Sequence, residues 1–378
     1  MIKKFSILLI ILMTIITLAG CWDFEDANKK SFILSVGVDK IDENVEITGE
    51  ATAFVALRGG GEAQAQRSPQ SFFQYSGIGN DIESARANIE QEVTQTFFLG
   101  ETRVVVFGKS YAENGIASYL SRIDSTYDYR KNLIVVISRE PAKKILSYPG
   151  NRKLGTGFYI EDNIKILTKN SAAIYTKIMD MISYKNIEGV GFFIPYIGIE
   201  KEGIRYLGLG VMKNFKLVDF IKVKDTTGIL YLLNEKPILT ESISLNDNKN
   251  KSIFKVFAKK RNIKTDYKND KVIINIDLNL DASLQYQYDM KPISDENKKE
   301  LQNKISENVK KDILENIDRS QNDYACDTFG FMNYFRAQNP KIYKTINWKH
   351  KYTSAEVNVN INTKIINTNL KDTKAKSK

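Results

Sequence analysis

The chain of 378 residues has very little of the chemistry that metal centres and disulfide frameworks require. It contains two cysteines, Cys21 and Cys326, and one histidine, His350. One histidine excludes sites with several histidine ligands, and two cysteines exclude a framework of several disulfides. The pair of Cys326 and His350 is the one thiol and base available, but its surroundings do not recommend it. A buried, inert thiol is the interpretation that we favour for Cys326.

Long hydrophobic runs are scarce as well, and the clearest one lies at the amino terminus. Lys3 and Lys4 precede an apolar run over residues 5–18. This run is short for a membrane span, which needs about 20 apolar residues. Small residues follow it directly before Cys21. This order of charged, apolar and then small residues predicts a secretory signal over residues 1–20, which is cleaved between Gly20 and Cys21.

The residues around the predicted cut resemble a known processing site. Leu18-Ala19-Gly20-Cys21 is similar to the lipobox of bacterial lipoproteins, in which the cysteine sulfur is joined to diacylglycerol. The resemblance implies a lipid on Cys21, and the acyl chains together would hold the chain on a membrane. An ordinary signal peptide with an incidental cysteine and an uncleaved anchor helix remain alternatives.

The composition is that of a folded chain with a basic balance. Hydrophobic residues make up 42% and charged residues 26%, and the formal net charge is +10. Residues 371–378 form a basic tail with four lysines and one aspartate. The charge suits an anionic membrane surface, although a drift in composition toward lysine explains it equally well. We expect no nucleic-acid partner for an exported chain.

The amino-terminal half predicts strands that alternate with helices. Two strands joined by a turn at 42–44 should form a hairpin, and the segment 58–69 is typical of a loop rather than a phosphate-binding site. Asn80 or Asp81 can cap a helix with apolar positions at helical spacing. The expected strands are 31–39, 45–57, 72–75, 102–107 and 132–138, and the expected helices begin near 81, 110, 141, 157 and 171.

The second half is dominated by alternation. Four short runs set off by glycines predict strands at 192–199, 204–212, 217–223 and 228–234. Strict alternation of apolar and polar residues at 272–280 and 357–361 predicts a sheet with one face exposed to solvent. Between these two segments, Ser294 and Asp295 open a helix whose apolar stripe is Leu301, Ile305, Val309, Ile313 and Ile317. We expect this helix to cover its own sheet, with docking to a partner helix as the alternative.

These patterns predict an α+β fold with several domains, in which mixed and antiparallel sheets are covered by helices. We place an amino-terminal α+β domain at 21–190, a small β-rich domain at 191–250, a carboxy-terminal α+β domain at 251–370 and the basic tail at 371–378. The length favours two or three domains.

Three groups of residues carry a resemblance to a family. Cys21-Trp22-Asp23 leads to an apolar strand that ends in Gly37-Val38-Asp39, and Gly100-Glu101-Thr102 opens a strand before a helix. Near the end stand Asp327-Thr328-Phe329-Gly330-Phe331, Arg336, Pro340 and Trp348, followed by the strand at 357–361. The chain thereby resembles the Ger(x)C spore germination lipoproteins, which are the C subunits of nutrient germinant receptors.

The resemblance implies a non-catalytic subunit of a germinant receptor, with no cofactor and no metal. It implies two integral-membrane partner subunits and a lipid-anchored position on the outer face of the spore inner membrane. The hypothesis is that the chain scaffolds or couples its partners in nutrient-triggered germination. An extracytoplasmic solute-binding lipoprotein is the alternative. A lipid-anchored hydrolase is less favoured, because carboxylates such as Glu161 with Asp162, or Asp323 with Asp327, carry no cue of a shared orientation.

Overall fold

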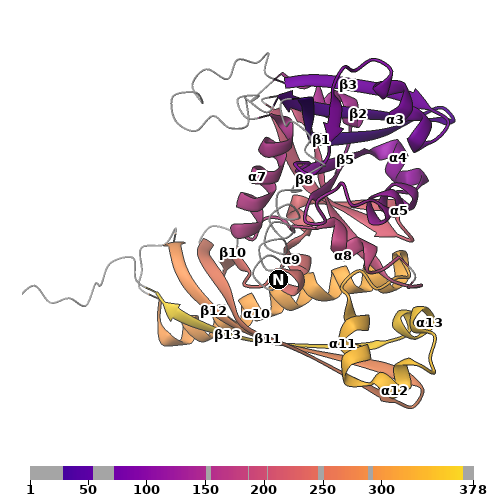
Figure 1. Cartoon of the computed structure of the whole chain (residues 1–378). Coiled ribbons are helices and arrows are strands. Elements are labelled where there is room, and N and C mark those ends of the chain that lie inside the picture. The colour runs from indigo at the N-terminus through magenta and orange to yellow at the C-terminus, as the bar shows by residue number, and fades with distance from the viewer. Residues whose placement is uncertain are drawn as a thin grey trace, which may run out of the picture.

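A computed structural model describes residues 29–53, 72–149, 155–185, 187–201, 203–245, 251–287 and 293–368. The predicted signal segment, Gly20, Cys21, the predicted loop at 58–69 and the basic tail lie outside these residues. The described part of the chain forms two sheets with helices, and the fold class is α+β as predicted (Figure 1).

The first sheet has nine strands in the order β3-β2-β1-β5-β6-β7-β8-β9, with β4 paired to β1. Strands β1, β5, β6 and β7 run parallel to one another, whereas β2, β3, β8 and β9 are joined by antiparallel pairing. The predicted hairpin of β1 and β2 is confirmed. The strands are β1 (Lys30–Ile41), β2 (Asn44–Ala53), β3 (Phe72–Gly79), β4 (Thr96–Phe98), β5 (Val104–Gly108), β6 (Ile134–Ser138), β7 (Gly191–Glu200), β8 (Gly203–Lys213) and β9 (Lys216–Lys222).

Helices cover both faces of this first sheet. One face packs against α3 (Ile82–Glu90), α4 (Lys109–Asn114), α5 (Ala117–Ser125) and α8 (Ile178–Ile182). The other face packs against α6 (Ala142–Leu146), α7 (Thr156–Lys169) and α9 (Thr227–Leu233). Every residue of β5 and β6 is therefore buried, which is why both strands are almost continuous apolar runs.

Buried carboxylates tie the strands to these helices. Asp39 in β1 accepts hydrogen bonds from the N–H groups of Ala142 (2.7 Å) and Lys143 (2.9 Å) at the start of α6. Glu50 in β2 accepts from the first two N–H groups of α7, at 2.8 and 3.0 Å. The first N–H groups of a helix lack partners within the helix, so a carboxylate beside them is stabilised. Asp39 and Glu50 are thus explained as helix caps, whereas Glu46, the other buried acid of β2, pairs with the Lys143 side chain.

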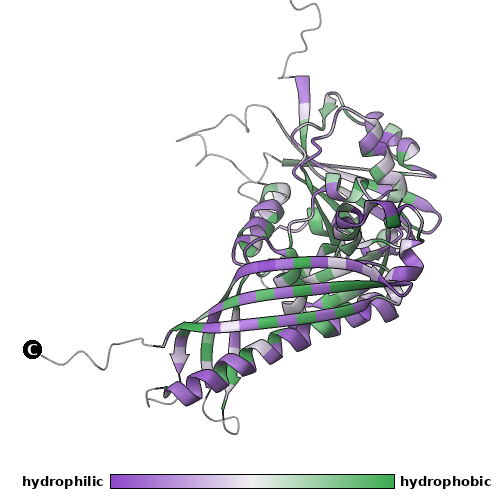
Figure 2. Ribbon diagram, turned by 90° about the horizontal axis from the view of Figure 1, so that it is seen from below, coloured by the Kyte–Doolittle hydropathy of each residue, from purple (hydrophilic) through white to green (hydrophobic). Residues whose placement is uncertain are grey.

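The second sheet has four strands in the order β10-β11-β12-β13 and is covered on one face. Its strands are β10 (Ile238–Ser244), β11 (Lys251–Lys268), β12 (Lys271–Gln287) and β13 (Glu356–Asn367). The predicted helix is α10 (Asp295–Asp318), which is capped by Ser294 and buries the five residues of the predicted stripe. Figure 2 shows the alternation of hydrophilic and hydrophobic residues along these strands, with α10 running beside them in this view. The expectation that this helix covers its own sheet is confirmed.

The last strand joins the second sheet in an unexpected direction. β10, β11 and β12 are antiparallel, as the alternation led us to expect, but β13 runs parallel to β12. A parallel return needs a crossover. The crossover here is α10 followed by α11 (Phe331–Gln338), α12 (Pro340–Tyr343) and α13 (Trp348–Thr353).

One continuous core joins the two sheets, with α9 and α10 lying between them (Figure 1). The two helices approach closely at Gly228, where an added Cβ would lie 2.3 Å from the carbonyl oxygen of Asp312. A second link is the parallel bridge between Val190 and Asp327, with the N–H of Gly191 donating to the Asp327 carbonyl at 2.9 Å. The two halves of the described chain are therefore held together by packing and by backbone hydrogen bonds.

Two expected elements are wrong. The expected strand at 228–234 is the helix α9, because its residues are buried on all sides and a short apolar run does not distinguish a strand from a buried helix. The helix expected over 171–184 is reduced to the single turn of α8. Residues 191–250, expected to form a small domain, contribute β7, β8 and β9 to the first sheet and β10 to the second.

Candidate functional site

At least five cavities of about 400 to 880 Å³ lie among the described residues, so volume alone does not identify a site. The largest, of about 880 Å³, lies along α7 and the ends of β7, β8 and β9, and its cations, Arg139, Arg205, Lys222 and Lys224, are exposed. Another, of about 400 Å³, lies between α3, α5 and the strands β1, β2, β3 and β4. Its floor includes Ile33, Ile89 and Tyr119, all less than 5% exposed. This second cavity is more enclosed than the largest one and its floor is buried, as in small-molecule sites, so it is the candidate site.

The local sequence places α3 close against the sheet. Asp81 caps the helix by accepting a hydrogen bond from the Ser84 N–H at 2.8 Å, as one of the two predicted caps. The absence of a side chain at Gly77 in β3 allows the approach, since a Cβ there would lie 2.3 Å from the carbonyl oxygen of Ala85. Ala85 and Ile89 face the sheet, as their spacing predicted, and the charged residues of α3 project toward α5.

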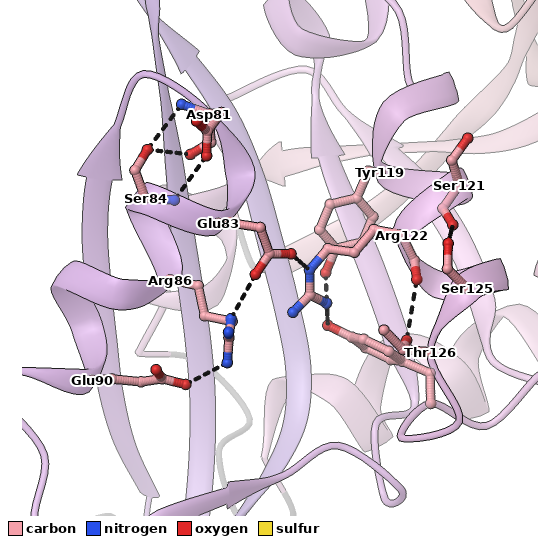
Figure 3. A network of polar contacts seen from close by, with 11 residues as sticks. Asp81, Glu83, Ser84, Arg86, Glu90, Tyr119, Ser121, Arg122, Ser125 and Thr126 are labelled. Atoms are coloured by element: carbon pink, nitrogen blue, oxygen red, sulfur yellow. Dashed lines mark hydrogen bonds and ion pairs between the residues drawn. The ribbon is translucent and has the colours of Figure 1, made fainter.

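A row of charges joins α3 to α5, as Figure 3 shows. Glu83 accepts from Arg122 Nε at 2.6 Å through one carboxylate oxygen and from Arg86 Nε at 3.0 Å through the other. Arg86 also donates from Nη1 to Glu90 at 2.5 Å. Partial burial opposes ionisation of Glu83, but the hydrogen bonds and charges of the two arginines outweigh it and hold the pKa of Glu83 below its usual value. The two arginines and two glutamates balance in charge.

Two tyrosines continue this network into the molecule. The hydroxyls of Tyr119 in α5 and Tyr129, which follows that helix, lie 3.0 Å apart, and Arg122 Nη1 donates to the Tyr129 oxygen at 3.4 Å. Burial raises the pKa of both tyrosines, so both hydroxyls stay protonated near neutral pH. The network offers hydrogen-bond donors that are held in place by packing.

The arrangement can bind but offers no pair of groups suited to nucleophilic catalysis. Burial raises the pKa of the Cys326 thiol to about 11, and the thiol lies near Gly191, whereas His350 is exposed in α13. The predicted burial of Cys326 is confirmed, and the two side chains make no hydrogen bond to each other in the described structure. Among the described residues there is also no group of three or more histidine, cysteine or acidic residues that could hold a metal ion.

Two of the four carboxylates considered for hydrolysis are buried and make structural contacts, whereas Asp162 and Asp323 are exposed. Glu161 is buried in α7, pairs with Lys165 at 2.9 Å and accepts a hydrogen bond from Tyr175 at 3.3 Å. Asp327 is buried and accepts from the N–H groups of Phe331 at 3.1 Å and Met332 at 2.7 Å, which caps α11. Both carboxylates have a structural explanation.

The sequence did not reveal the candidate site. Its walls come from six separate elements, and its arginines resemble any solvated helix face when they are taken alone. The spacing of Glu83, Arg86 and Glu90, three and four residues apart on one helix, was the available signal for an ion-pair row. The predicted lipidation site at Cys21 and the cleavage site after Gly20 lie outside the described residues. Within the described part, no helix is both long enough and apolar enough to cross a bilayer.

Comparison with known proteins identifies the family. A family model described as the spore germination protein N-terminal domain matches residues 23–199, and one described as spore germination B3/GerAC like, C-terminal, matches residues 207–369. Spore germination protein B3 of Bacillus subtilis (strain 168) is 21% identical over 378 residues, covering 97% of both chains. Spore germination protein KC of the same strain is 25% identical over 195 residues, covering 46% of this chain and 47% of that protein.

The fold agrees with these matches. The crystal structure of the GerBC protein superposes with a TM-score of 0.57 at 17% identity, covering 88% of this chain and 97% of that one. The chain belongs to the family of spore germination proteins that are the C subunits of germinant receptors, as the resemblance implied. The first family model ends at residue 199 in β7 and the second begins at residue 207 in β8, so the break between them falls inside the first sheet.

Proposed function

We propose that the chain is a non-catalytic subunit of a spore germinant receptor that scaffolds or couples two integral-membrane partner subunits. The observation that carries this proposal is the continuous core between the two sheets. A coupling subunit must transmit displacement from one contact surface to another, and a single packed core does so because it is nearly incompressible. Membership of the family indicates that the process in which the chain acts is spore germination.

We further propose that diacylglycerol on Cys21 holds the chain on the outer face of the spore inner membrane. The first described strand begins at Lys30, nine residues after Cys21. A short connection of this kind would keep the first sheet near the bilayer surface, where the partner subunits would be reached. The proposal rests on the resemblance of residues 18–21 to a lipobox.

The test is mass spectrometry of the mature amino terminus from spore membranes, combined with germination of strains that carry the native chain or Cys21→Ala. The expected result is a diacylglycerol-modified Cys21 in the native strain, and in the Cys21→Ala strain a loss of the chain from the membrane together with a loss of nutrient-triggered germination. As a matched control, Cys326→Ala should leave both properties unchanged, because the Cys326 thiol is buried. Normal germination and normal membrane retention in the Cys21→Ala strain would contradict the proposal.

A coupling role is tested separately by separating α9 from α10. Gly228→Val places a side chain against the Asp312 backbone and should weaken the link between the two sheets. We expect the partner subunits still to co-purify with the Gly228→Val chain, while nutrient-triggered germination of that strain is reduced. Full germination with a chain that is demonstrably folded would contradict coupling through this core.

A further inference from the structure

The cavity between α3, α5 and the first sheet has a glycine in its wall that the backbone does not require. Gly49 lies in β2 between Ile47 and Ala51 on the same face of the strand, and it has no positive φ. A Cβ added at Gly49 would meet only the Ile33 side chain, at 3.6 Å, which is an ordinary contact. Glycine in the middle of a strand costs stability. This one keeps open a space that almost any other residue would fill.

Aromatic side chains form the walls of that space. Tyr75 and Phe97 have ring centroids 5.3 Å apart, and Phe98 and Tyr119 also border the cavity. The volume of about 400 Å³ falls within the roughly 300–1,000 Å³ of small-molecule sites. An apolar body, aromatic or branched, suits such walls.

At the polar end of the cavity, two arginines have N–H groups that are not used by the hydrogen bonds within the network. Arg86 and Arg122 each use Nε on Glu83, and their Nη1 atoms donate to Glu90 and Tyr129. Within the described residues, the Nη2 atom of neither arginine has a hydrogen-bond partner. Guanidinium groups pair well with carboxylate and sulfonate groups, and the Arg122 side chain is only 13% exposed. The cavity thus joins apolar walls to the guanidinium groups of Arg86, which is 43% exposed, and Arg122, with Lys30, Glu90 and Asp128 also at its border.

We propose that this cavity is a binding site for a small organic monoanion. Its apolar body would lie against Gly49 and the aromatic walls, and its anionic group would be held by Nη2 of Arg86 and Arg122. This binding function goes beyond scaffolding and does not depend on it. The largest cavity, at the ends of β7, β8 and β9, is more open to solvent than this one.

The experiment uses residues 22–378, which include every described residue, and two fluorescent probes with the same hydrocarbon body. One is 1-anilinonaphthalene-8-sulfonate, an anion, and the other is the uncharged N-phenyl-1-naphthylamine. The native chain should bind the anion saturably at one site. Gly49→Phe should weaken both probes at least tenfold, because the added ring occupies the cavity, while its melting temperature stays at or above that of the native chain. If this variant does not fold, Gly49→Val serves in its place, with a smaller loss of binding.

Two further variants separate the apolar walls from the anionic contact. Arg86→Gln should weaken the anionic probe about tenfold and leave the uncharged one unchanged, since a hydrogen bond to a charged group is lost. Val218→Phe, at an exposed position on β9 in the same sheet, should change neither. Native affinity in a folded Gly49 variant, no saturable binding of the anion by the native chain, or an equal effect of Arg86→Gln on both probes would overturn the proposal.

Discussion

The two sheets bury their side chains in different ways. In β5 and β6 every residue is buried, because helices cover both faces of the first sheet. In β12 the apolar residues between Val272 and Leu284 are buried in strict alternation, because α10 covers one face only. The same element type therefore carries a near-continuous apolar run in one half of the molecule and a period-two pattern in the other.

The difference extends to the polar residues. In the first sheet, Asp39 and Glu50 are buried and cap helices. On the open face of the second sheet, polar side chains pair across neighbouring strands: the Asn358 amide donates to the Asn275 amide oxygen and the Asn360 amide to the Asp277 carboxylate, each at 3.2 Å. These buried polar residues of the first sheet therefore connect strands to helices. We expect polar residues on the solvent-exposed face of the second sheet to tolerate substitution.

The largest effect is expected in the second sheet, on its covered face. Ile276→Ala should lower the free energy of unfolding by about 3 kcal/mol, since it empties space in a closed core. The neighbouring Asp277→Ala should change it by less than about 0.5 kcal/mol, because its side chain lies on the open face. Urea unfolding followed by circular dichroism measures both. Equal losses would show that the open face is covered in solution.

In the first sheet, substitution of two adjacent strand residues should lower the free energy of unfolding by similar amounts, unlike the pair in the second sheet. Val105 and Val106 are adjacent in β5, point to opposite faces and are both completely buried. Val105→Ala and Val106→Ala should each cost about 2 kcal/mol of unfolding free energy, from lost burial and from the cavity left behind. Chemical unfolding of the two variants beside the native chain is the measurement. A large loss for only one of them would contradict a sheet that is covered on both faces.

The smallest effect concerns a buried acid in the second half that caps no helix. Burial raises the pKa of Glu241 in β10 to about 7, and Asp312 adds repulsion, although a hydrogen bond from Tyr231 at 3.2 Å favours the charged form. The folded chain then binds this proton more tightly than the unfolded chain does. The resulting stability is fully present below about pH 4.5 and is lost as the pH rises through about 7.

Glu241→Gln removes this titration and keeps an acceptor for Tyr231. Between pH 6 and pH 8 the native chain should lose about 1.3 kcal/mol of unfolding free energy that the variant does not lose. Melting curves of both chains across this range measure the difference. Parallel pH profiles would mean that Glu241 is ionised in the folded chain throughout.

Much of the fold could be predicted from local pattern. The helix α10, its cap Ser294 and its buried stripe follow from spacing along one segment, as do the β1–β2 hairpin and the alternation of β12. These features depend on residues close together in the chain, where periods of 3.6 and 2 are visible. The resemblance to the germination family likewise needed only short motifs, and the family models confirmed it.

The candidate site could not be predicted, because no local pattern records it. Gly49, Arg86 and Arg122 belong to three elements, and each has an ordinary explanation when it is taken alone. Their arrangement around one cavity depends on the packing of α3 and α5 on the sheet. The signal segment and Cys21 are the opposite case: the sequence alone predicts them, from residues 1–21.

The sequence by itself determined the α+β class, the family and the helices and strands that bury one face. The regular spacing of apolar residues in such elements is visible in the sequence. Only the tertiary structure decided that 228–234 is the helix α9, that 191–222 completes the first sheet and that β13 returns parallel to β12. A segment that is buried on all sides has no polar face to reveal its period. Its conformation is therefore chosen by the neighbours against which it packs.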